Sequence, residues 1–355
     1  MPMVVIAGAG VMGTAFTFPL VDAGCRVRLV GTPLDEQHIE VMKNGQVHPR
    51  LGTAIDDSVE IYYASQLGEA LRADVDLVVI GVSSAGIGWA IENLGPLVRT
   101  TMPILLLSKG LTVEDGHILS LPEKVQRGLA KTGVPEAMVG GVGGPCIAGE
   151  LAGRRHTSVV VSFTDQTLVD RIVPLLQTEY YHVAQSSNLT GVEGCAALKN
   201  LYALGIGAPQ GMLERKGEKE KKVLMHNLAS ALFSQAIQEM AVFEQVFSGG
   251  VNSAYGLAGA GDLYVTCQAG RNSRMGRLLG MGMRYSEAKK KHMADDTIEG
   301  AELATAIGPA VKQMFGDGRL DKREFPLAEA IIAAVVDDER LEFAWKRFHR
   351  LQPVR

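Results

Sequence analysis

The sequence predicts an α/β fold, with an N-terminal doubly wound parallel sheet and an all-helical C-terminal domain. An apolar segment at Met3–Ala7 runs directly into the pattern Gly-x-Gly-x-x-Gly at residues 8–13, and apolar runs alternate with helical stretches up to about residue 188. From residue 189 onward, apolar residues recur at helical spacing instead. Strands that alternate with helices are typical of a parallel sheet covered on both faces. We therefore expect a Rossmann-type dinucleotide-binding domain at residues 1–188 and an all-helical domain at residues 189–355.

The glycine pattern predicts a dinucleotide-binding loop, because a strand precedes it and a helix follows it. Gly8 permits the tight turn, Gly10 lets a pyrophosphate approach the backbone, and Gly13 lets the helix pack closely on the strand. Val11 and Met12 open that helix, whose free N–H groups and positive dipole end attract phosphates. The alternative is an ordinary glycine-rich turn, which this strand–turn–helix context disfavours. We expect NAD or NADP as the cofactor.

Polar residues follow several of the later strands, where the ligand crevice of a doubly wound sheet lies. Lys109 comes directly after an apolar run, and Gly144 follows another strand. A lysine in this place could also be a surface residue at a strand exit. Residues 31–35, after the second strand, offer neither an acidic nor a basic residue where it would select between NAD and NADP. Further strands are expected at residues 25–31, 59–62, 76–82, 102–108, 137–140, 157–161 and 181–184.

Composition narrows the class of partner. The 355 residues carry a net charge of −4, which gives no reason to expect nucleic acid or an anionic membrane surface. No apolar run reaches the ~18–20 residues of a membrane span. The four cysteines are far apart and lack C-x-x-C spacing, so we expect free thiols and no metal site. Because the first strand begins at the N-terminus, we expect no signal or transit peptide and a cytoplasmic enzyme.

The second half is rich in helix signals. Residues 223–247 resemble one long helix that is apolar on most faces, as expected of a helix buried in a domain or in a dimer interface. We expect a homodimer. The preceding residues 214–222 are almost all charged. They are interpreted as a solvated loop, with a mobile flap near the site as the alternative.

Seven further motifs follow the glycine pattern in a specific order. They are His48-Pro49-Arg50-Leu51-Gly52, Ser108-Lys109-Gly110-Leu111, Gly144-Pro145-Cys146-Ile147-Ala148, Ala197-Leu198-Lys199-Asn200, Gly261-Asp262-Leu263-Tyr264-Val265-Thr266-Cys267, Gly270-Arg271-Asn272 and Glu299-Gly300. Together they resemble the NAD(P)-dependent glycerol-3-phosphate dehydrogenase family over about residues 3–300. The resemblance implies a dehydrogenase that interconverts dihydroxyacetone phosphate and sn-glycerol 3-phosphate, a small phosphorylated substrate.

The resemblance also implies that the helical domain at residues 189–355 binds the substrate and carries out catalysis, and it implies roles for individual residues. Lys199 matches the lysine that donates and accepts the proton, and Asp262 matches a residue beside it. The remaining substrate residues that it implies are Lys109, Gly144, Asn200, Thr266, Arg271 and Asn272. The remaining cofactor residues that it implies are Lys109, Ala148, Arg271 and Glu299.

Elementary chemistry supports these roles. Hydride transfer to a ketone develops negative charge on its oxygen, which a nearby cationic acid stabilises and protonates. Arginine presents a planar fork that suits phosphate. The alternatives are an interhelical ion pair for Lys199, a helix N-cap for Asp262 and an ordinary loop for Arg271.

The chain also departs from the family pattern. Gly270 replaces a hydroxyl residue, and Ala229 and Gln235 stand where basic residues are usual. These departures leave open a dehydrogenase of another three- or four-carbon phosphorylated polyol, or a reductase of the 3-hydroxyacid or ketopantoate type. A non-catalytic nucleotide sensor is the third alternative, which the retention of Lys109 and Lys199 argues against.

Overall fold

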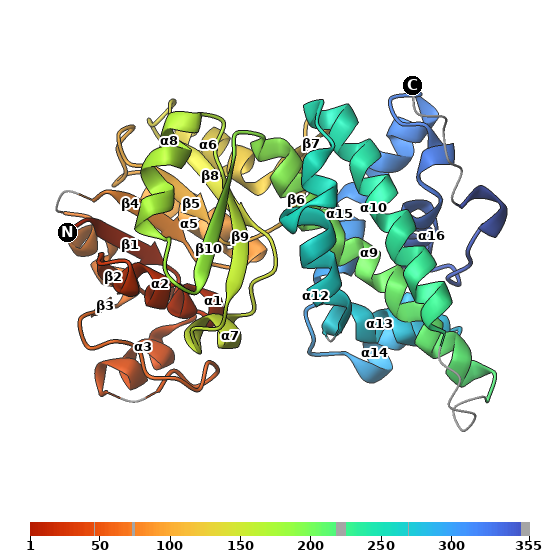
Figure 1. Ribbon diagram of the computed structural model, residues 1–355, viewed down its shortest axis with the longest axis horizontal. Coiled ribbons are helices and arrows are strands. Elements are labelled where there is room, and N and C mark those ends of the chain that lie inside the picture. The colour runs from red at the N-terminus through yellow and green to blue at the C-terminus, as the bar shows by residue number, and fades with distance from the viewer. Residues whose placement is uncertain (46, 73–74, 218–224, 269, 349–355) are drawn as a thin grey trace. The chain divides into compact units, whose positions relative to one another are not determined.

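The computed structural model describes residues 1–355 except 46, 73–74, 218–224, 269 and 349–355 (Figure 1). The chain forms two compact units. Unit 1 comprises residues 1–109 and 120–193, and unit 2 comprises residues 110–119 and 194–355. The domain boundary expected at residues 188/189 stays a prediction.

Unit 1 is built on an eight-stranded sheet in the order β10-β9-β8-β5-β4-β1-β2-β3. The strands are β1 Met3–Ala7, β2 Arg26–Val30, β3 Glu60–Tyr62, β4 Leu77–Ile80, β5 Ile104–Leu106, β8 Val139–Gly143, β9 Thr157–Ser162 and β10 Tyr181–Ser186. The central strand β1 is parallel to both of its neighbours, so that Val5 pairs with Arg28 on one side and Val78 on the other. This is the doubly wound sheet that the alternating pattern predicts.

The apolar strands are buried on both faces, because side chains alternate across the sheet. Val4 and Ile6 of β1 belong to one hydrophobic cluster, whereas Val5 and Ala7 belong to the other. The helices of unit 1 are α1 Val11–Ala15, α2 Thr17–Asp22, α3 Glu36–Lys43, α4 Leu67–Ala70, α5 Ile87–Leu94, α6 Leu121–Lys131, α7 Ala148–Ala152 and α8 Gln166–Ile172. Short 3₁₀ turns lie at Ala64–Gln66, Ser84–Gly86 and Val173–Leu175.

One strand pair departs from the parallel arrangement. β8 and β9 run antiparallel, with Val142 opposite Val161. The connection between them, residues 144–156, contains only the five-residue α7, so the chain turns back at the same edge of the sheet instead of crossing over. β10 then follows β9 through α8 and is parallel to it.

The described residues of unit 2 form helices joined by loops, together with one hairpin. Its helices are α9 Leu189–Arg215, which begins in unit 1, α10 His226–Ser248, α11 Asn252–Tyr255, α12 Asp262–Gln268, α13 Arg271–Gly280, α14 Tyr285–His292, α15 Glu299–Gly316 and α16 Pro326–Val336. A π-helical turn occupies Leu257–Gly261, and 3₁₀ turns lie at Lys322–Glu324 and Trp345–Arg347.

The hairpin of β6 (Leu111–Glu114) and β7 (His117–Ser120) was not predicted. Asp115 and Gly116 form its two-residue turn with φ values of 51° and 74°. Asp-Gly is the sequence signal for a turn that needs positive φ at both central positions.

Glycines bring α9 and α13 into close contact. A Cβ at Gly276 would lie 2.0 Å from the Leu204 carbonyl oxygen, and one at Gly280 would lie 2.0 Å from the Ala208 carbonyl oxygen. Larger side chains would force the two helices apart. In the first turn of α13, Asn272 also contacts Asn200 of α9.

The charged segment is partly helical. Glu214 and Arg215 form the last turn of α9, and Arg277 donates to Glu214 from Nε and Nη2 at 2.7 Å each. The Glu214 side chain is 7% exposed, so the expectation of a solvated loop is wrong at this residue. Residues 218–222 lie outside the described part of the chain, as do residues 223–224 at the expected start of the long helix.

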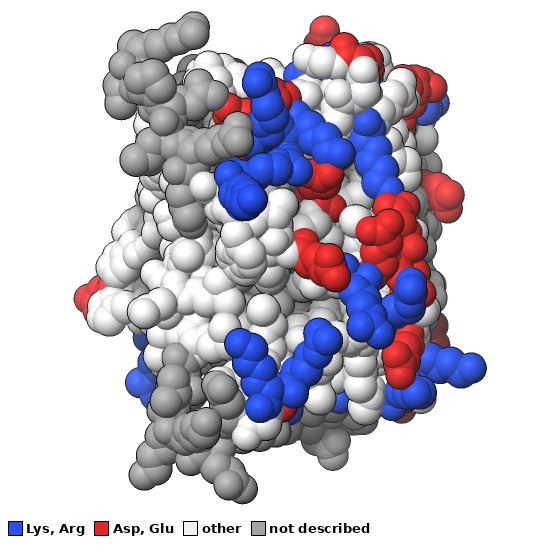
Figure 2. Space-filling view, turned by 90° about the vertical axis from the view of Figure 1, so that its right-hand side faces the viewer, with Lys and Arg blue, Asp and Glu red and all other residues white. Residues whose placement is uncertain are grey.

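No helix among the described residues combines the length and the apolar character needed to cross a bilayer. On the face that Figure 2 shows, the described Lys and Arg side chains are interspersed with Asp and Glu side chains.

Candidate active site

The three glycines of the glycine loop, residues 8–13, differ in their surroundings. Close packing requires glycine at Gly8 and Gly13, whereas Gly10 faces open space. Gly8 has a φ of +118°, and a Cβ there would lie 2.8 Å from the carbonyl carbon of Gly81. A Cβ at Gly13 would lie 2.0 Å from the Gly8 carbonyl oxygen. A Cβ at Gly10, the residue before α1, would meet no atom of the described residues within 4 Å. The backbone at Gly10 is therefore open to a ligand, and this open cradle fits a pyrophosphate.

Val11, Met12 and Ala148 lie beside this loop. Val11 and Met12 form the first turn of α1, and both are half-buried. Ala148 is the first residue of α7, which packs against α1. Met12 and Ala148 contact the same hydrophobic cluster of unit 1, which brings these three predicted cofactor residues to one region.

Lys109 and Gly144 are in direct contact. Lys109 Nζ donates to the Gly144 carbonyl oxygen at 2.7 Å, and Gly144 adopts a φ of +106° that favours glycine. The predicted substrate lysine is therefore fixed at the end of β8, where a parallel sheet presents its ligand crevice.

Glu193 is a site candidate that the sequence analysis missed. It is completely buried, and among the described residues neither carboxyl oxygen has a hydrogen-bond partner. A Cβ at Gly141 of β8 would lie 2.1 Å from its Oε1, so the glycine makes room for the carboxyl group. Burial raises the pKa of Glu193 to about 8, against the opposing charge of Lys109. A buried, perturbed acid near a predicted substrate lysine is a feature typical of functional sites.

Lys199 and Asp262 form a buried ion pair in unit 2. Lys199 Nζ lies 2.5 Å from Asp262 Oδ1, and the two residues are 9% and 2% exposed. Thr266 donates from Oγ1 to the Asp262 carbonyl oxygen at 2.7 Å, one turn along α12. Burial raises the pKa of Cys267 to about 12, although the positive charge of Lys199 lowers it. The thiol is therefore protonated at neutral pH.

Asn200, the neighbour of Lys199, is joined to the predicted phosphate-binding residues. Asn272 Nδ2 donates to Asn200 Oδ1 at 3.0 Å, and the Gly300 backbone N–H donates to Asn272 Oδ1 at 2.9 Å. Arg271 forms an ion pair with Glu299, and both side chains are solvent-accessible, at 48% and 39%. The predicted residues of unit 2 thus lie in the middle of α9, on α12 and at the starts of α13 and α15.

The buried network around Gln235 gives a structural reason for one departure from the family pattern. Gln235 is 4% exposed, and its Nε2 donates to Glu239 Oε1 at 3.0 Å. Glu239 in turn accepts from the backbone N–H groups of Leu327 and Ala328 at the start of α16. Gln235 therefore supports a helix start, and Ala229, which is half-buried, lies further up the same helix.

The described residues contain no group of three or more His, Cys, Asp or Glu side chains arranged to hold a metal ion. The four cysteines are free thiols.

Comparisons with known proteins identify the family of this chain. The family model of the NAD-dependent glycerol-3-phosphate dehydrogenase N-terminus matches residues 3–169, and that of the C-terminus matches residues 188–346. An NADP(+)-dependent glycerol-3-phosphate dehydrogenase from Archaeoglobus fulgidus is 36% identical over 289 residues, which cover 81% of this chain and 83% of that protein. A glycerol-3-phosphate dehydrogenase [NAD(P)+] from Enterobacter is 29% identical over 81% of this chain and 80% of its own length.

Solved structures show the same fold. A glycerol-3-phosphate dehydrogenase from Coxiella burnetii has a TM-score of 0.76 at 24% identity, and the match covers 96% of each chain. The Plasmodium falciparum glycerol-3-phosphate dehydrogenase has a TM-score of 0.81 at 16% identity, with 100% of this chain and 97% of that chain covered. The chain belongs to the NAD-dependent glycerol-3-phosphate dehydrogenase family and is an oxidoreductase that uses NAD or NADP.

Proposed function

We propose that this enzyme interconverts dihydroxyacetone phosphate and sn-glycerol 3-phosphate, with Lys199 as the general acid and base. The observation that carries the proposal is the buried contact between Lys199 Nζ and Asp262 Oδ1. A buried ammonium group beside the Asp262 carboxylate can donate a proton to a ketone oxygen as negative charge develops there. In the reverse direction the neutral amine accepts the hydroxyl proton. When bound, NAD(P)H supplies the hydride.

Asp262 positions the amine of Lys199. Its carboxylate fixes Nζ, while Thr266 anchors the backbone carbonyl of the same residue from the next turn. A catalytic group that is held in place loses little freedom when the substrate reacts. Lys109, fixed on Gly144, is proposed to bind the substrate.

The phosphate is proposed to bind at the start of α13, through Arg271 and Asn272. The planar guanidinium of Arg271 can form two parallel hydrogen bonds to phosphate, which a lysine cannot. Glu299 holds Arg271 before substrate arrives, so phosphate would compete with this carboxylate. Asn200 orients Asn272 through the amide contact at 3.0 Å.

The cofactor is proposed to bind at the glycine loop of unit 1. The open backbone at Gly10 supports this proposal. So does the positive φ of Gly8, a backbone conformation that glycine adopts more readily than other residues. Val11 and Met12 present the first N–H groups of α1 to the pyrophosphate. Ala148 lies beside this loop on α7.

A substrate panel tests the proposed reaction. Oxidation of NADH and NADPH is followed with dihydroxyacetone phosphate, a larger ketose phosphate, unphosphorylated dihydroxyacetone and a 2-oxo acid. We expect the highest kcat/KM for dihydroxyacetone phosphate and a poor reaction with dihydroxyacetone. Preference for the 2-oxo acid would refute the phosphate site. Preference for the larger ketose phosphate would keep the mechanism and change the substrate.

We further propose a cytoplasmic homodimer. Exposed apolar side chains gather near the end of α10 and on α11, namely Val246, Val251 and Tyr255. Such side chains are typical of a surface that another chain covers. Sedimentation should give twice the 38.0 kDa chain mass, and a Tyr255→Glu variant should sediment as a monomer.

A further inference from the structure

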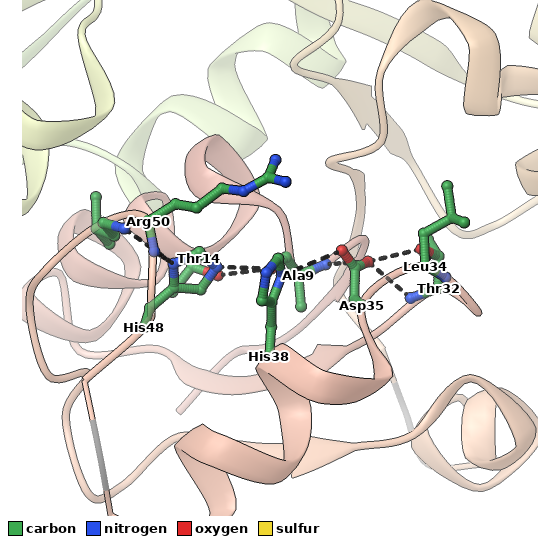
Figure 3. Close-up of polar contacts among 9 residues, drawn as sticks. Ala9, Thr14, Thr32, Leu34, Asp35, His38, His48 and Arg50 are labelled. Carbon is green, nitrogen blue, oxygen red and sulfur yellow. Dashed lines mark hydrogen bonds and ion pairs between the residues drawn. The ribbon is translucent and has the colours of Figure 1, made fainter. Parts of the chain in front are cut away.

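The carbonyl group of Ala9, inside the glycine loop, is held by a buried histidine from a distant segment. His48 is completely buried, and its Nε2 lies 3.1 Å from the Ala9 carbonyl oxygen. Thr14 Oγ1 donates to the same oxygen at 3.2 Å. On the other side, the Ala9 backbone N–H donates to Asp35 Oδ2 at 3.2 Å. Figure 3 shows His48 and Asp35 approaching Ala9 from opposite sides.

These contacts fix the protonation state of His48. Its Nδ1 accepts from the backbone N–H groups of Arg50 and Leu51, at 3.2 and 3.0 Å. A ring nitrogen that accepts hydrogen bonds carries no proton. The carbonyl oxygen of Ala9 can only accept, so Nε2 must carry the proton. The hydrogen-bond network therefore assigns His48 as the neutral imidazole protonated at Nε2.

A second proton on His48 would break this arrangement. A protonated Nδ1 would face the backbone N–H groups of Arg50 and Leu51. These three groups are all donors, so none of them would have an acceptor. Two titratable side chains lie near the ring among the described residues: His38, whose ring centroid is 4.8 Å away, and Asp35. Arg50 contacts the ring through its backbone, and Thr14 of α1 is uncharged. Burial lowers the pKa of His48, and the nearby His38 lowers it further, against the carboxylate of Asp35.

The carboxylate of Asp35 joins the glycine loop to the residues that follow β2. Its Oδ2 accepts from the Thr32 backbone N–H at 2.9 Å and from Thr32 Oγ1 at 2.7 Å, in addition to Ala9. Asp35 therefore braces the loop from the β2 side, and His48 braces it from the segment that follows α3. Gly10, whose backbone is open to a ligand, directly follows Ala9 in the chain.

We propose that His48 is a positioning residue for the cofactor: its neutral imidazole holds the Ala9 carbonyl in place, and a second proton releases the glycine loop and weakens cofactor binding. This inference rests on the proposed cofactor site. It adds to that site a residue that does not touch the cofactor and a pH dependence of its affinity.

Two variants separate the functions of the two ring nitrogens. His48→Gln places an amide nitrogen near the position of Nε2 and does not titrate, whereas His48→Asn keeps an acceptor near Nδ1 and loses the donor to Ala9. The control is His156→Gln, since His156 is an exposed histidine bonded to His182 in the same unit. The dissociation constant of NADPH is measured for all four proteins between about pH 5 and 8, by quenching of protein fluorescence.

We expect the parent and the His156→Gln control to bind NADPH more weakly as the pH falls. The loss should approach tenfold per pH unit below the pKa of His48. His48→Gln should show a shallower pH dependence, because glutamine does not titrate. The slope that remains in this variant comes from ionisation of NADPH itself, which is common to all four proteins. His48→Asn should bind more weakly at every pH, by roughly 2- to 10-fold, the worth of one hydrogen bond.

Equal pH slopes in the parent and in His48→Gln would overturn this inference and leave the cofactor site standing. Absence of NADPH and NADH binding to the parent at any pH would overturn both. A second measurement uses the parent alone, so that it does not depend on a folded variant. Histidine ¹⁵N shifts at neutral pH should show one buried ring protonated at Nε2 and bare at Nδ1, and the opposite tautomer for His48 would contradict the proposal.

Discussion

Lys199 Nζ lies 2.5 Å from Asp262 Oδ1 across 63 residues of sequence, and this contact joins the middle of α9 to the first residue of α12. The π-helical turn Leu257–Gly261 precedes Asp262 directly. π-Turns are rare and often occur at functional sites. A Cβ at Gly259 would lie 2.2 Å from the Ala254 carbonyl oxygen, so this turn depends on a glycine. The position of Asp262 is thus set by the local backbone as well as by its ion pair.

Replacing the carboxylate tests whether Asp262 positions Lys199. Asp262→Asn keeps a hydrogen-bond acceptor of the same size and removes the charge. We expect kcat to fall by roughly 10²–10⁴, the usual worth of a positioned proton-transfer group. The dissociation constant of NADPH should stay within about threefold of the parent, because the glycine loop lies in the other unit. Unchanged kcat in this variant would remove Asp262 from the mechanism.

Two glycine substitutions should have opposite consequences. Gly10→Val adds atoms where no described atom lies within 4 Å, so the protein should fold normally and bind cofactor less tightly. A steric clash between the valine side chain and the cofactor that costs about 1–3 kcal/mol would raise the dissociation constant of the cofactor by roughly 5- to 150-fold. Gly13→Ala places a Cβ 2.0 Å from the Gly8 carbonyl oxygen, so it should lower the thermal unfolding midpoint. Unfolding scans and cofactor titrations of both variants check this pair, and equally tight binding by Gly10→Val would refute the glycine-loop assignment.

Glu193 should make stability depend on pH. Its folded pKa of about 8 lies above its ordinary value of 4.5, so the native state resists an ionisation that the unfolded chain permits. Below about pH 4.5 Glu193 is protonated in both states, so its ionisation does not lower the free energy of unfolding. As the pH rises from about 4.5 toward 8, only the unfolded chain ionises, and the free energy of unfolding falls. Glu193→Gln should therefore match the parent near pH 4.5 and have the higher unfolding midpoint near pH 8. Glu92→Gln, at an exposed position of α5, is the control. A constant difference between Glu193→Gln and the parent across this range would contradict a buried neutral acid.

Arg271 should matter only for phosphorylated substrates. Arg271→Ala is expected to cost about 1.5–3 kcal/mol of binding, the range for a charged hydrogen bond, and so to raise KM for dihydroxyacetone phosphate by roughly 10- to 150-fold. The same variant should leave the weak reaction with unphosphorylated dihydroxyacetone almost unchanged. Arg271→Lys should restore part of the loss, because a lysine keeps the charge without the planar fork. Steady-state kinetics with both ketones checks this, and equal losses for the two would place Arg271 away from the phosphate.

Much of the fold follows from local sequence patterns. The continuous apolar segments of β1, β4 and β5 and the glycine pattern after β1 predict a buried parallel sheet with a ligand loop at its edge. The antiparallel pairing of β8 with β9 depends on the path of residues 144–156, which no periodicity reports. The hairpin at 111–120 carries an Asp-Gly signal, but its flanking strands are too short to stand out.

Local sequence patterns also fail to predict several features of the candidate site. The motif order places Lys199 and Asp262 together only through resemblance to a family, because nothing local relates residues 63 positions apart. Glu193 lies in an apolar helix start, and its significance depends on the space that Gly141 leaves on a strand 52 residues earlier. The neutral tautomer of His48 likewise follows from three hydrogen bonds between its ring and the backbone of Ala9, Arg50 and Leu51. These features belong to tertiary packing, so they become visible only in the structure.

The proton-transfer role of Lys199 is the central claim, and a single variant tests it most directly. Steady-state reduction of dihydroxyacetone phosphate by Lys199→Ala should show kcat lowered by roughly 10²–10⁴, with the NADPH dissociation constant within about threefold of the parent. Exogenous primary amines should restore part of the rate, because they supply the missing acid. A kcat equal to that of the parent would contradict the account, as would a loss that amines leave untouched and that weaker cofactor binding explains in full.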